Sequence, residues 1–200
     1  MTRKISKVFV WSVAVLLFCA APASAQDFTH PTTGTTNFSV TGTHNYYDSG
    51  GADCSPAGEY AASEDGIAVI CPATAGEFVT IEFLDVDVET STSSECWDYL
   101  TIYDGNSTSG TQLIHGCGEE GFASCAGNPG DGGDCNGAEG GACDINGSNF
   151  ATPANNSFTS TDATGCLTVQ FTSDSSVQEG GWVATVSAAV PVELMSFSVE

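Results

Sequence analysis

The sequence has 200 residues, with 25 Asp and Glu against three Lys and Arg, and a formal net charge of -22. All three basic residues lie in the first seven positions, so the rest of the chain is purely acidic. A surface without Lys or Arg cannot neutralise phosphates, which excludes nucleic-acid binding and phosphate-clamping enzymes. Cations, neutral glycans and basic proteins are the partners that such a surface favours.

The N-terminal segment has the pattern of a secretory signal peptide. A basic head at 1–7 precedes an apolar run at 8–21, and three small residues at 23–25 then precede Gln26. The run is shorter than a membrane span. We therefore predict cleavage after Ala25 and a secreted protein that is extracellular or held at the cell surface, with no membrane insertion.

The pattern of the mature chain predicts a single all-β unit. Residues 26–43 are rich in Thr and predict an extended N-terminal arm. Apolar and polar residues alternate at 79–83, and the alternation slips by one position over 84–89, which predicts a bulge in one long strand. Further alternating stretches lie at 100–102, before an Asp104-Gly105 turn, and at 167–171 and 182–186. Many short strands separated by turn residues indicate a β-sandwich.

Two segments depart from this alternation. Residues 119–156 are rich in Gly, Asn, Asp and Ala, hold three cysteines and show no hydrophobic period, which predicts a long loop insertion pinned by disulfides. At the other end, residues 189–200 are expected to form a strand-like tail. Within it, 191–200 resembles the stretch that precedes a type IX secretion sorting domain in Bacteroidota proteins. The sandwich itself is expected to span 44–188.

The mature chain keeps eight cysteines, an even number that is typical of disulfide-stapled exported proteins. Spacing by itself selects no pairing among them. No C-x-x-C motif occurs, which disfavours a zinc site or a redox dithiol, with metal ligation or a free thiol as the alternative to staples.

Several motifs, taken in order, resemble the CUB domain family, of the kind found in secreted Bacteroidota proteins. They are 47–51 (YDSGG), 83–89 (FLDVDVE), 96–105 (CWDYLTIYDG), 116–118 (GCG), 171–174 (FTSD) and 181–184 (GWVA). The resemblance implies a two-sheet, jelly-roll-like β-sandwich that mediates extracellular recognition. It also implies a disulfide between Cys96 and Cys117 and suggests one between Cys54 and Cys71. The insertion departs from the family pattern, so it implies no partner for Cys125, Cys135, Cys143 or Cys166.

Many CUB domains bind calcium, and the motif positions of their three acidic ligands match Glu89, Asp98 and Asp174. Calcium takes six to eight hard oxygen ligands, which carboxylates from separate loops can supply at one end of a sandwich. A hydroxyl such as that of Tyr60 would complete the shell. The alternative is a solvated acidic strand end, because a chain with so many carboxylates forms chance clusters.

A weaker calcium hypothesis falls on the insertion, where Asp131, Asp134 and Asp144 lie among Gly and Asn. This loop does not fit the pattern of an EF-hand, and a series of Asx turns is the favoured interpretation.

The sequence carries no motif of a known catalytic centre, and the resemblance points to a protein that is not an enzyme. A glycosidase needs only two carboxylates at the right separation, so that class stays a remote alternative. Aromatic side chains would stack on glycans, although core packing is the favoured interpretation for them. The candidates are Tyr46, Tyr47, Trp97, Tyr99, Tyr103 and Trp182.

Two hypotheses follow. The first is a secreted, calcium-binding, CUB-like module for recognition of or adhesion to an extracellular protein or glycan. The second is a self-assembling subunit of an extracellular fibre or surface layer, in which copies are linked through their terminal segments by strand addition.

Overall fold

The computed structural model describes residues 27–52, 58–89, 91, 96–121, 143–144 and 156–191, and every regular element among them is a strand. The strands are β1 (Phe28–Thr29), β2 (Thr33–Val40), β3 (Thr43–Tyr47), β4 (Asp65–Pro72), β5 (Phe78–Val88), β6 (Tyr99–Asp104), β7 (Thr111–Gly121), β8 (Cys143–Asp144), β9 (Ser157–Thr159), β10 (Leu167–Thr172) and β11 (Gly181–Ala189). No helix that could span a membrane occurs in this described part of the chain.

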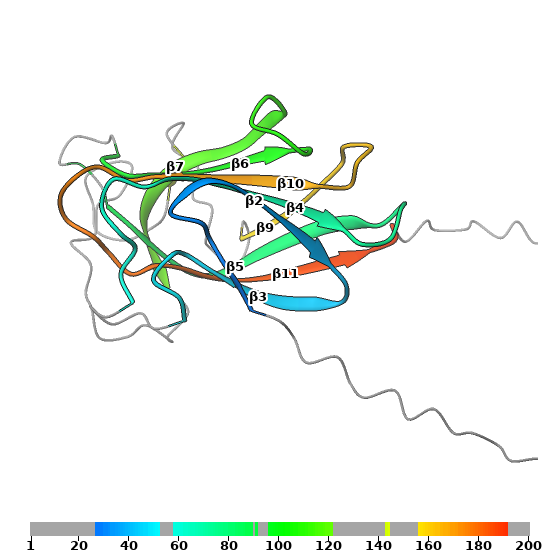
Figure 1. Cartoon of the computed structure of the whole chain (residues 1–200), viewed down its shortest axis with the longest axis horizontal. Coiled ribbons are helices and arrows are strands. Elements are labelled where there is room, and N and C mark those ends of the chain that lie inside the picture. The colour runs from blue at the N-terminus through cyan, green and yellow to red at the C-terminus, as the bar shows by residue number, and fades with distance from the viewer. Residues whose placement is uncertain are drawn as a thin grey trace, which may run out of the picture.

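The strands form two packed layers, which confirms the predicted all-β, two-sheet sandwich. One layer has the order β1-β3-β11-β5 and the other has the order β6-β10-β4-β2. Strand β7 belongs to both, because its first part pairs with β6 and its last residues, from Gly118 onward, pair with β5. Figure 1 shows β3, β5 and β11 in one layer and β2, β4, β6 and β10 in the other, with β7 at one side.

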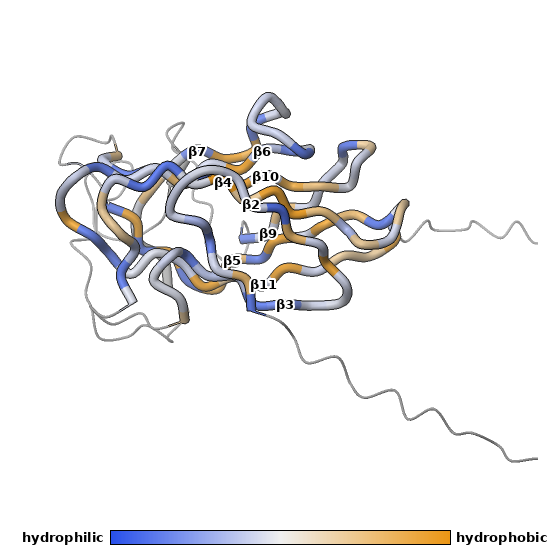
Figure 2. Tube along the Cα trace, in the orientation of Figure 1, coloured by the Kyte–Doolittle hydropathy of each residue, from blue (hydrophilic) through white to orange (hydrophobic). Residues whose placement is uncertain are grey.

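The core lies between the two layers and follows from the two-residue period of the strands. Leu167, Val169 and Phe171 of β10 and Trp182, Ala184 and Val186 of β11 are buried in one hydrophobic cluster, in which Phe171 packs edge-on against Trp182. Figure 2 shows the hydrophobic colour along β4, β5, β10 and β11 and the hydrophilic colour in the connecting loops. Burial of these rows is the main force that holds the two sheets together.

The predicted bulge lies in β5. The pairing of β5 with β11 runs from Ala189↔Phe78 to Ala184↔Phe83, and then resumes at Val183↔Asp85. Leu84 is the extra residue, and it shifts the inward row from Ile81 and Phe83 to Val86 and Val88. The slip in the sequence pattern therefore has a direct structural cause.

The N-terminal arm expected at 26–43 is instead part of the sandwich. Strand β2 pairs in parallel with β4 over eight residue pairs, and β1 pairs in parallel with β3. Phe28 stacks on Phe38 and His44, with ring centroids 4.7 Å away in both cases. Burial of Phe28 holds this segment to the core. The Thr-rich composition of the segment gave no indication of this packing.

Two disulfides lie within the described residues. Cys96 bonds to Cys117, the pair that the resemblance implies, whereas Cys71 bonds to Cys166. The suggested Cys54–Cys71 bond is therefore corrected. Strands β4 and β10 are antiparallel neighbours with Ile70 opposite Leu167, so Cys71 and Cys166 are the next pair along this ladder, with Cα atoms 4.2 Å apart.

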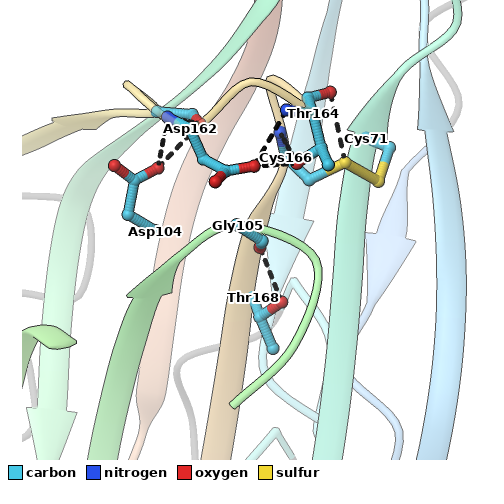
Figure 3. Close-up of a disulfide and its surroundings, with 8 residues drawn as sticks. Cys71, Asp104, Gly105, Asp162, Thr164, Cys166 and Thr168 are labelled. Atoms are coloured by element: carbon cyan, nitrogen blue, oxygen red, sulfur yellow. Dashed lines mark hydrogen bonds between the residues drawn. A yellow bond between two sulfur atoms is a disulfide. The ribbon is translucent and has the colours of Figure 1, made fainter. Parts of the chain in front are cut away.

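Figure 3 shows the surroundings of the Cys71–Cys166 bond, which lies beside the first residues of β10. The Asp104 carboxylate accepts hydrogen bonds from the Ser160 hydroxyl (2.8 Å) and from the Thr161 and Asp162 N–H groups. Burial alone would raise the pKa of Asp104, but a hydrogen bond from the Thr161 hydroxyl, together with these bonds, lowers it below its ordinary value. Here hydroxyls and backbone N–H groups together satisfy the Asp104 carboxylate, which stabilises the loop at 160–162.

Candidate metal centre

Three acidic residues meet at the opposite end of β10. Glu89 follows the last residue of β5, Asp98 precedes the first residue of β6, and Asp174 comes two residues after β10. Because β6 and β10 are antiparallel with Tyr99 opposite Thr172, the start of one strand meets the end of the other. One carboxylate oxygen from each residue lies within 4.8 Å of the other two. The structure therefore brings together the three residues that the sequence motifs predict.

Asp98 is the buried centre of this cluster. Its Oδ2 accepts a hydrogen bond from the Tyr60 hydroxyl at 2.6 Å, and its Oδ1 accepts one from the Asp174 N–H at 2.6 Å. The Tyr60 hydroxyl in turn accepts a hydrogen bond from the Glu89 N–H at 3.1 Å. Tyr60 is itself buried and packs edge-on against Phe171 of the core, 4.8 Å between ring centroids. The core thus positions the Tyr60 hydroxyl between the Asp98 carboxylate and the Glu89 backbone.

The electrostatics of the cluster are unfavourable without a cation. Burial, together with the charges of Asp98 and Asp174, raises the pKa of Glu89 to about 7. Burial also raises the pKa of Asp98, despite the hydrogen bonds from Tyr60 and Asp174. Neither Lys nor Arg occurs after residue 7, so the described part of the chain supplies no positive side chain to offset these charges.

An orphaned oxygen provides a test of whether a metal fits. Glu89 Oε2 is buried and has no hydrogen-bond partner among the described residues. A buried polar atom without a partner costs about 1–3 kcal/mol. A hard divalent cation between the three carboxylates would satisfy this oxygen and would offset the mutual repulsion. The donor set and the orphaned atom therefore fit a cation of the calcium type.

Two further carboxylates lie buried at the same end, and the sequence analysis assigned them no role. Asp48, at the end of β3, accepts hydrogen bonds from Gly50 N–H (2.6 Å) and Trp182 N–H (3.0 Å). Burial raises its pKa to about 7, with a smaller contribution from the charge of Glu64. The apolar row of β3, which alternates into the core, would have indicated an inward Asp48.

Glu64 lies just before β4 and is 3% exposed. Its Oε1 accepts hydrogen bonds from the Ser49 hydroxyl and, at 2.6 Å, from the Ala61 N–H. Its Oε2 is buried without a partner among the described residues, and burial raises its pKa. The YDSGG motif of the sequence therefore has a structural role. Asp48 bonds to the start of β11, and Ser49 bonds to Glu64 just before β4.

Exposed apolar side chains lie close in sequence to two of the candidate metal ligands. Trp97, next to Asp98, is 55% exposed, and Val177, three residues after Asp174, is 54% exposed. Val177 has a φ of 53°, a conformation that β-branched residues rarely adopt. The Ser176 N–H closes this loop on Asp174 Oδ1 at 2.7 Å.

The other expected site residues fall into three groups: buried core residues, exposed residues, and residues that lie outside the described part of the chain. Among the proposed glycan-stacking aromatics, Tyr46 and Trp182 are core residues, whereas Trp97 is exposed. Of the second calcium loop, Asp131 and Asp134 lie outside the described residues, and Asp144 is described only as a backbone partner of Gly116. Cys54, Cys125 and Cys135 lie outside them as well.

The fold and the site define a two-sheet β-sandwich that has a cluster of three carboxylates, able to hold a metal ion, at one end. No protein-family model matches the chain, and the comparison with curated proteins gave no match. Among solved structures it is similar to the CUB1-EGF-CUB2 domains of rat MASP-1 (18% identity, TM-score 0.49), over 78% of this chain and 43% of that one. It is also similar to the extracellular region of zebrafish Gpr126/Adgrg6 (17%, TM-score 0.44), over 80% and 15%.

A third similar structure is the MASP-1 CUB2 domain bound to Ca2+ (17% identity, TM-score 0.43), over 77% of this chain and 99% of that one. The chain thus spans less than half the length of the first two structures. The similarity concerns the fold alone, and the topology described above rests on the strand pairing of this chain.

Proposed function

We propose that this chain is a non-enzymatic, calcium-binding module for extracellular recognition or adhesion. The observation that carries the proposal is the convergence of Glu89, Asp98 and Asp174, together with the buried Glu89 Oε2, which no donor among the described residues reaches. The Tyr60 hydroxyl would join the ligand set. Calcium at this point would hold the ends of β5, β6 and β10 together and so order the surface between them.

Two features of that surface support a binding role rather than a catalytic one. Trp97 and Val177 present apolar area beside the carboxylates, and an aromatic side chain of this kind suits contact with protein or glycan. His30 is 2% exposed, and both of its ring nitrogens are engaged in hydrogen bonds, so it is shielded from a substrate. The acidic surface favours a partner that is basic or neutral.

The test compares two matched substitutions. Glu89→Gln removes one proposed ligand charge, whereas Glu82→Gln removes the same charge from an exposed position of β5. Calcium at about ten times its Kd would stabilise the protein by about 1.4 kcal/mol. For a chain of this size that corresponds to a rise in Tm of roughly 3–6 °C. We expect this rise in the wild type and in Glu82→Gln, and its loss in Glu89→Gln.

Terbium luminescence, excited through the nearby aromatic side chains, provides an independent measure of occupancy. Arrays of glycans and extracellular proteins, screened in calcium and in chelator, then test recognition. The proposal requires hits that depend on calcium, that Glu89→Gln loses and that Glu82→Gln keeps. It fails if calcium changes neither Tm nor terbium emission, or if both variants lose binding equally.

A further inference from the structure

Strand β2 forms an open edge of the sandwich. It ends the layer β6-β10-β4-β2, and among the described residues no strand pairs with its other side. Figure 1 shows β2 at the front of the molecule, nearest the viewer. Its eight residues would extend over about 26 Å. The other layer ends in β1, which has only two residues, so β2 is the long open edge of this part of the chain.

This edge lacks the protection that edge strands usually have. Natural proteins block such edges with charged side chains, with Pro or with a bulge. Strand β2 contains no charged residue and no Pro, and its pairing with β4 runs without a register shift. Its outward row of Thr33, Thr35, Asn37 and Ser39 is exposed, whereas Phe38 and Val40 face the core. The N–H and C=O groups of this edge, which no described strand pairs with, can therefore accept another strand.

The charge distribution selects the kind of strand. From Asp27 onward the chain holds 25 carboxylates and no Lys or Arg, yet residues 28–47 contain none of them. This is the longest carboxylate-free stretch after Asp27, and β2 lies within it. Two copies of such an acidic molecule repel each other over most orientations. A contact along β2 brings their neutral segments together, so that neither of the two paired strands carries a carboxylate.

The chemistry of the outward row also suits a copy of itself. Two β2 strands that meet antiparallel around a two-fold axis place Thr, Asn and Ser side chains opposite one another. Such cross-strand hydroxyl and amide pairs stabilise a sheet, and no like charges oppose each other. A basic partner, in contrast, would gain nothing from the neutral edge and would prefer the acidic end.

We propose that two copies of this chain associate through their β2 edges, which joins the β6-β10-β4-β2 layers of both into one continuous sheet. The contact is closed and two-fold, so it yields a dimer and not a filament. It is independent of the calcium hypothesis, because none of its residues belongs to the acidic cluster. Because distant carboxylates still repel, added salt strengthens the dimer.

The test uses the exported protein in sedimentation equilibrium over a range of concentrations, in calcium and in chelator. The double variant Thr35→Glu/Asn37→Glu places like charges opposite each other across the two-fold axis. We expect its dimer Kd to rise at least tenfold. The control Thr108→Glu makes the same kind of change at an exposed turn residue between β6 and β7 and leaves the Kd within about twofold.

Hydrogen exchange locates the contact. Amides of 33–40 should become more protected as the protein concentration rises, and this protection should vanish in the double variant. Removal of residues 192–200 should leave the dimer intact. The proposal is overturned by a wild-type protein that stays monomeric at high salt, by equal effects of the two variants, or by loss of assembly on removal of 192–200, which would assign assembly to the tail instead.

Discussion

The buried carboxylate of Asp48 lies directly against the α-carbon of Gly181. A Cβ added at Gly181 would lie 2.2 Å from both Cγ and Oδ2 of Asp48. Gly181 also has a φ of 70°, which L side chains rarely adopt. The absence of a side chain lets the Trp182 N–H reach Asp48 Oδ2. This contact joins the end of β3 to the start of β11 beside the acidic cluster.

Gly181→Ala should therefore be strongly destabilising. Positive φ costs about 1–2 kcal/mol for a residue with a Cβ, and overpacking adds about 1–3 kcal/mol. Gly42→Ala is the matched control, since its φ is 77° but a Cβ there would meet nothing within 4 Å. Urea unfolding should show the larger loss for Gly181→Ala. Equal losses of unfolding free energy would mean that the Asp48 carboxylate moves away from the added Cβ at little energetic cost.

Calcium affinity should depend on pH near neutrality. Without a cation the pKa of Glu89 is about 7, and calcium binds the deprotonated form. Binding at pH 6 should therefore release a proton, and the Kd should be roughly tenfold weaker at pH 6 than at pH 7.5. Calorimetry in buffers of different ionisation enthalpy measures both effects. A Kd that is constant over this range would contradict the assignment of Glu89 as a ligand.

His30 should behave as a neutral core residue. Its Nε2–H donates to the Gly66 carbonyl at 3.1 Å, so its Nδ1 accepts a hydrogen bond from the Tyr46 hydroxyl at 2.6 Å. Burial lowers its pKa to about 4, from an ordinary value of 6.5. The folded pKa is below the unfolded one, so the unfolding free energy falls as the pH drops from 6.5 towards 4 and then levels off.

Between pH 7.5 and 4.5 this contribution amounts to about 2–3 kcal/mol. Asp48 acts in the opposite direction, because its raised folded pKa makes the fold gain stability as the pH falls below 7. The useful measurement is therefore the difference between the wild type and His30→Gln, which should lose less stability on acidification. Parallel pH profiles for the two proteins would contradict the neutral assignment, as would an NMR titration of His30 near pH 6.5.

The Cys71–Cys166 bond should stabilise the fold more than Cys96–Cys117 does. The bonded residues are 95 and 21 positions apart, respectively. The loop-entropy model assigns the longer loop about 1 kcal/mol more, from totals of roughly 3–5 kcal/mol. Urea unfolding of the two paired Cys→Ser variants, in chelator, measures the difference. A larger loss for the shorter loop would show that native-state packing, rather than chain entropy, determines the effect.

Peptide mapping under non-reducing conditions checks the pairing itself. It should recover Cys71 linked to Cys166 and not to Cys54. Recovery of a Cys54–Cys71 peptide would restore the pairing that the motif resemblance suggests.

Alternating patterns were sufficient to predict the strands that face a single core. The inward rows of β6, β10 and β11 and the bulge at Leu84 are all visible in the order of apolar residues, because strand side chains alternate with a period of two. The pairing of β1 and β2 within the sandwich was not predictable in this way. Phe28 and Phe38 are isolated among Thr residues, and only their stacking across the sandwich shows that this segment is packed.

The sequence by itself determined the acidity of the protein and its strand pattern, because these depend on residue type and short-range order. It pointed to the three carboxylates of the candidate metal centre only through the resemblance of its motifs to the CUB family. Only the tertiary structure decided that Cys71 bonds to Cys166, that Asp48 and Glu64 are buried beside the cluster, and that β2 is an open edge. The physical reason is that these features depend on which strands become neighbours. Strand pairing brings together residues that are nearly a hundred positions apart in the sequence. A local pattern of residues carries no information about which distant strand will be the neighbour.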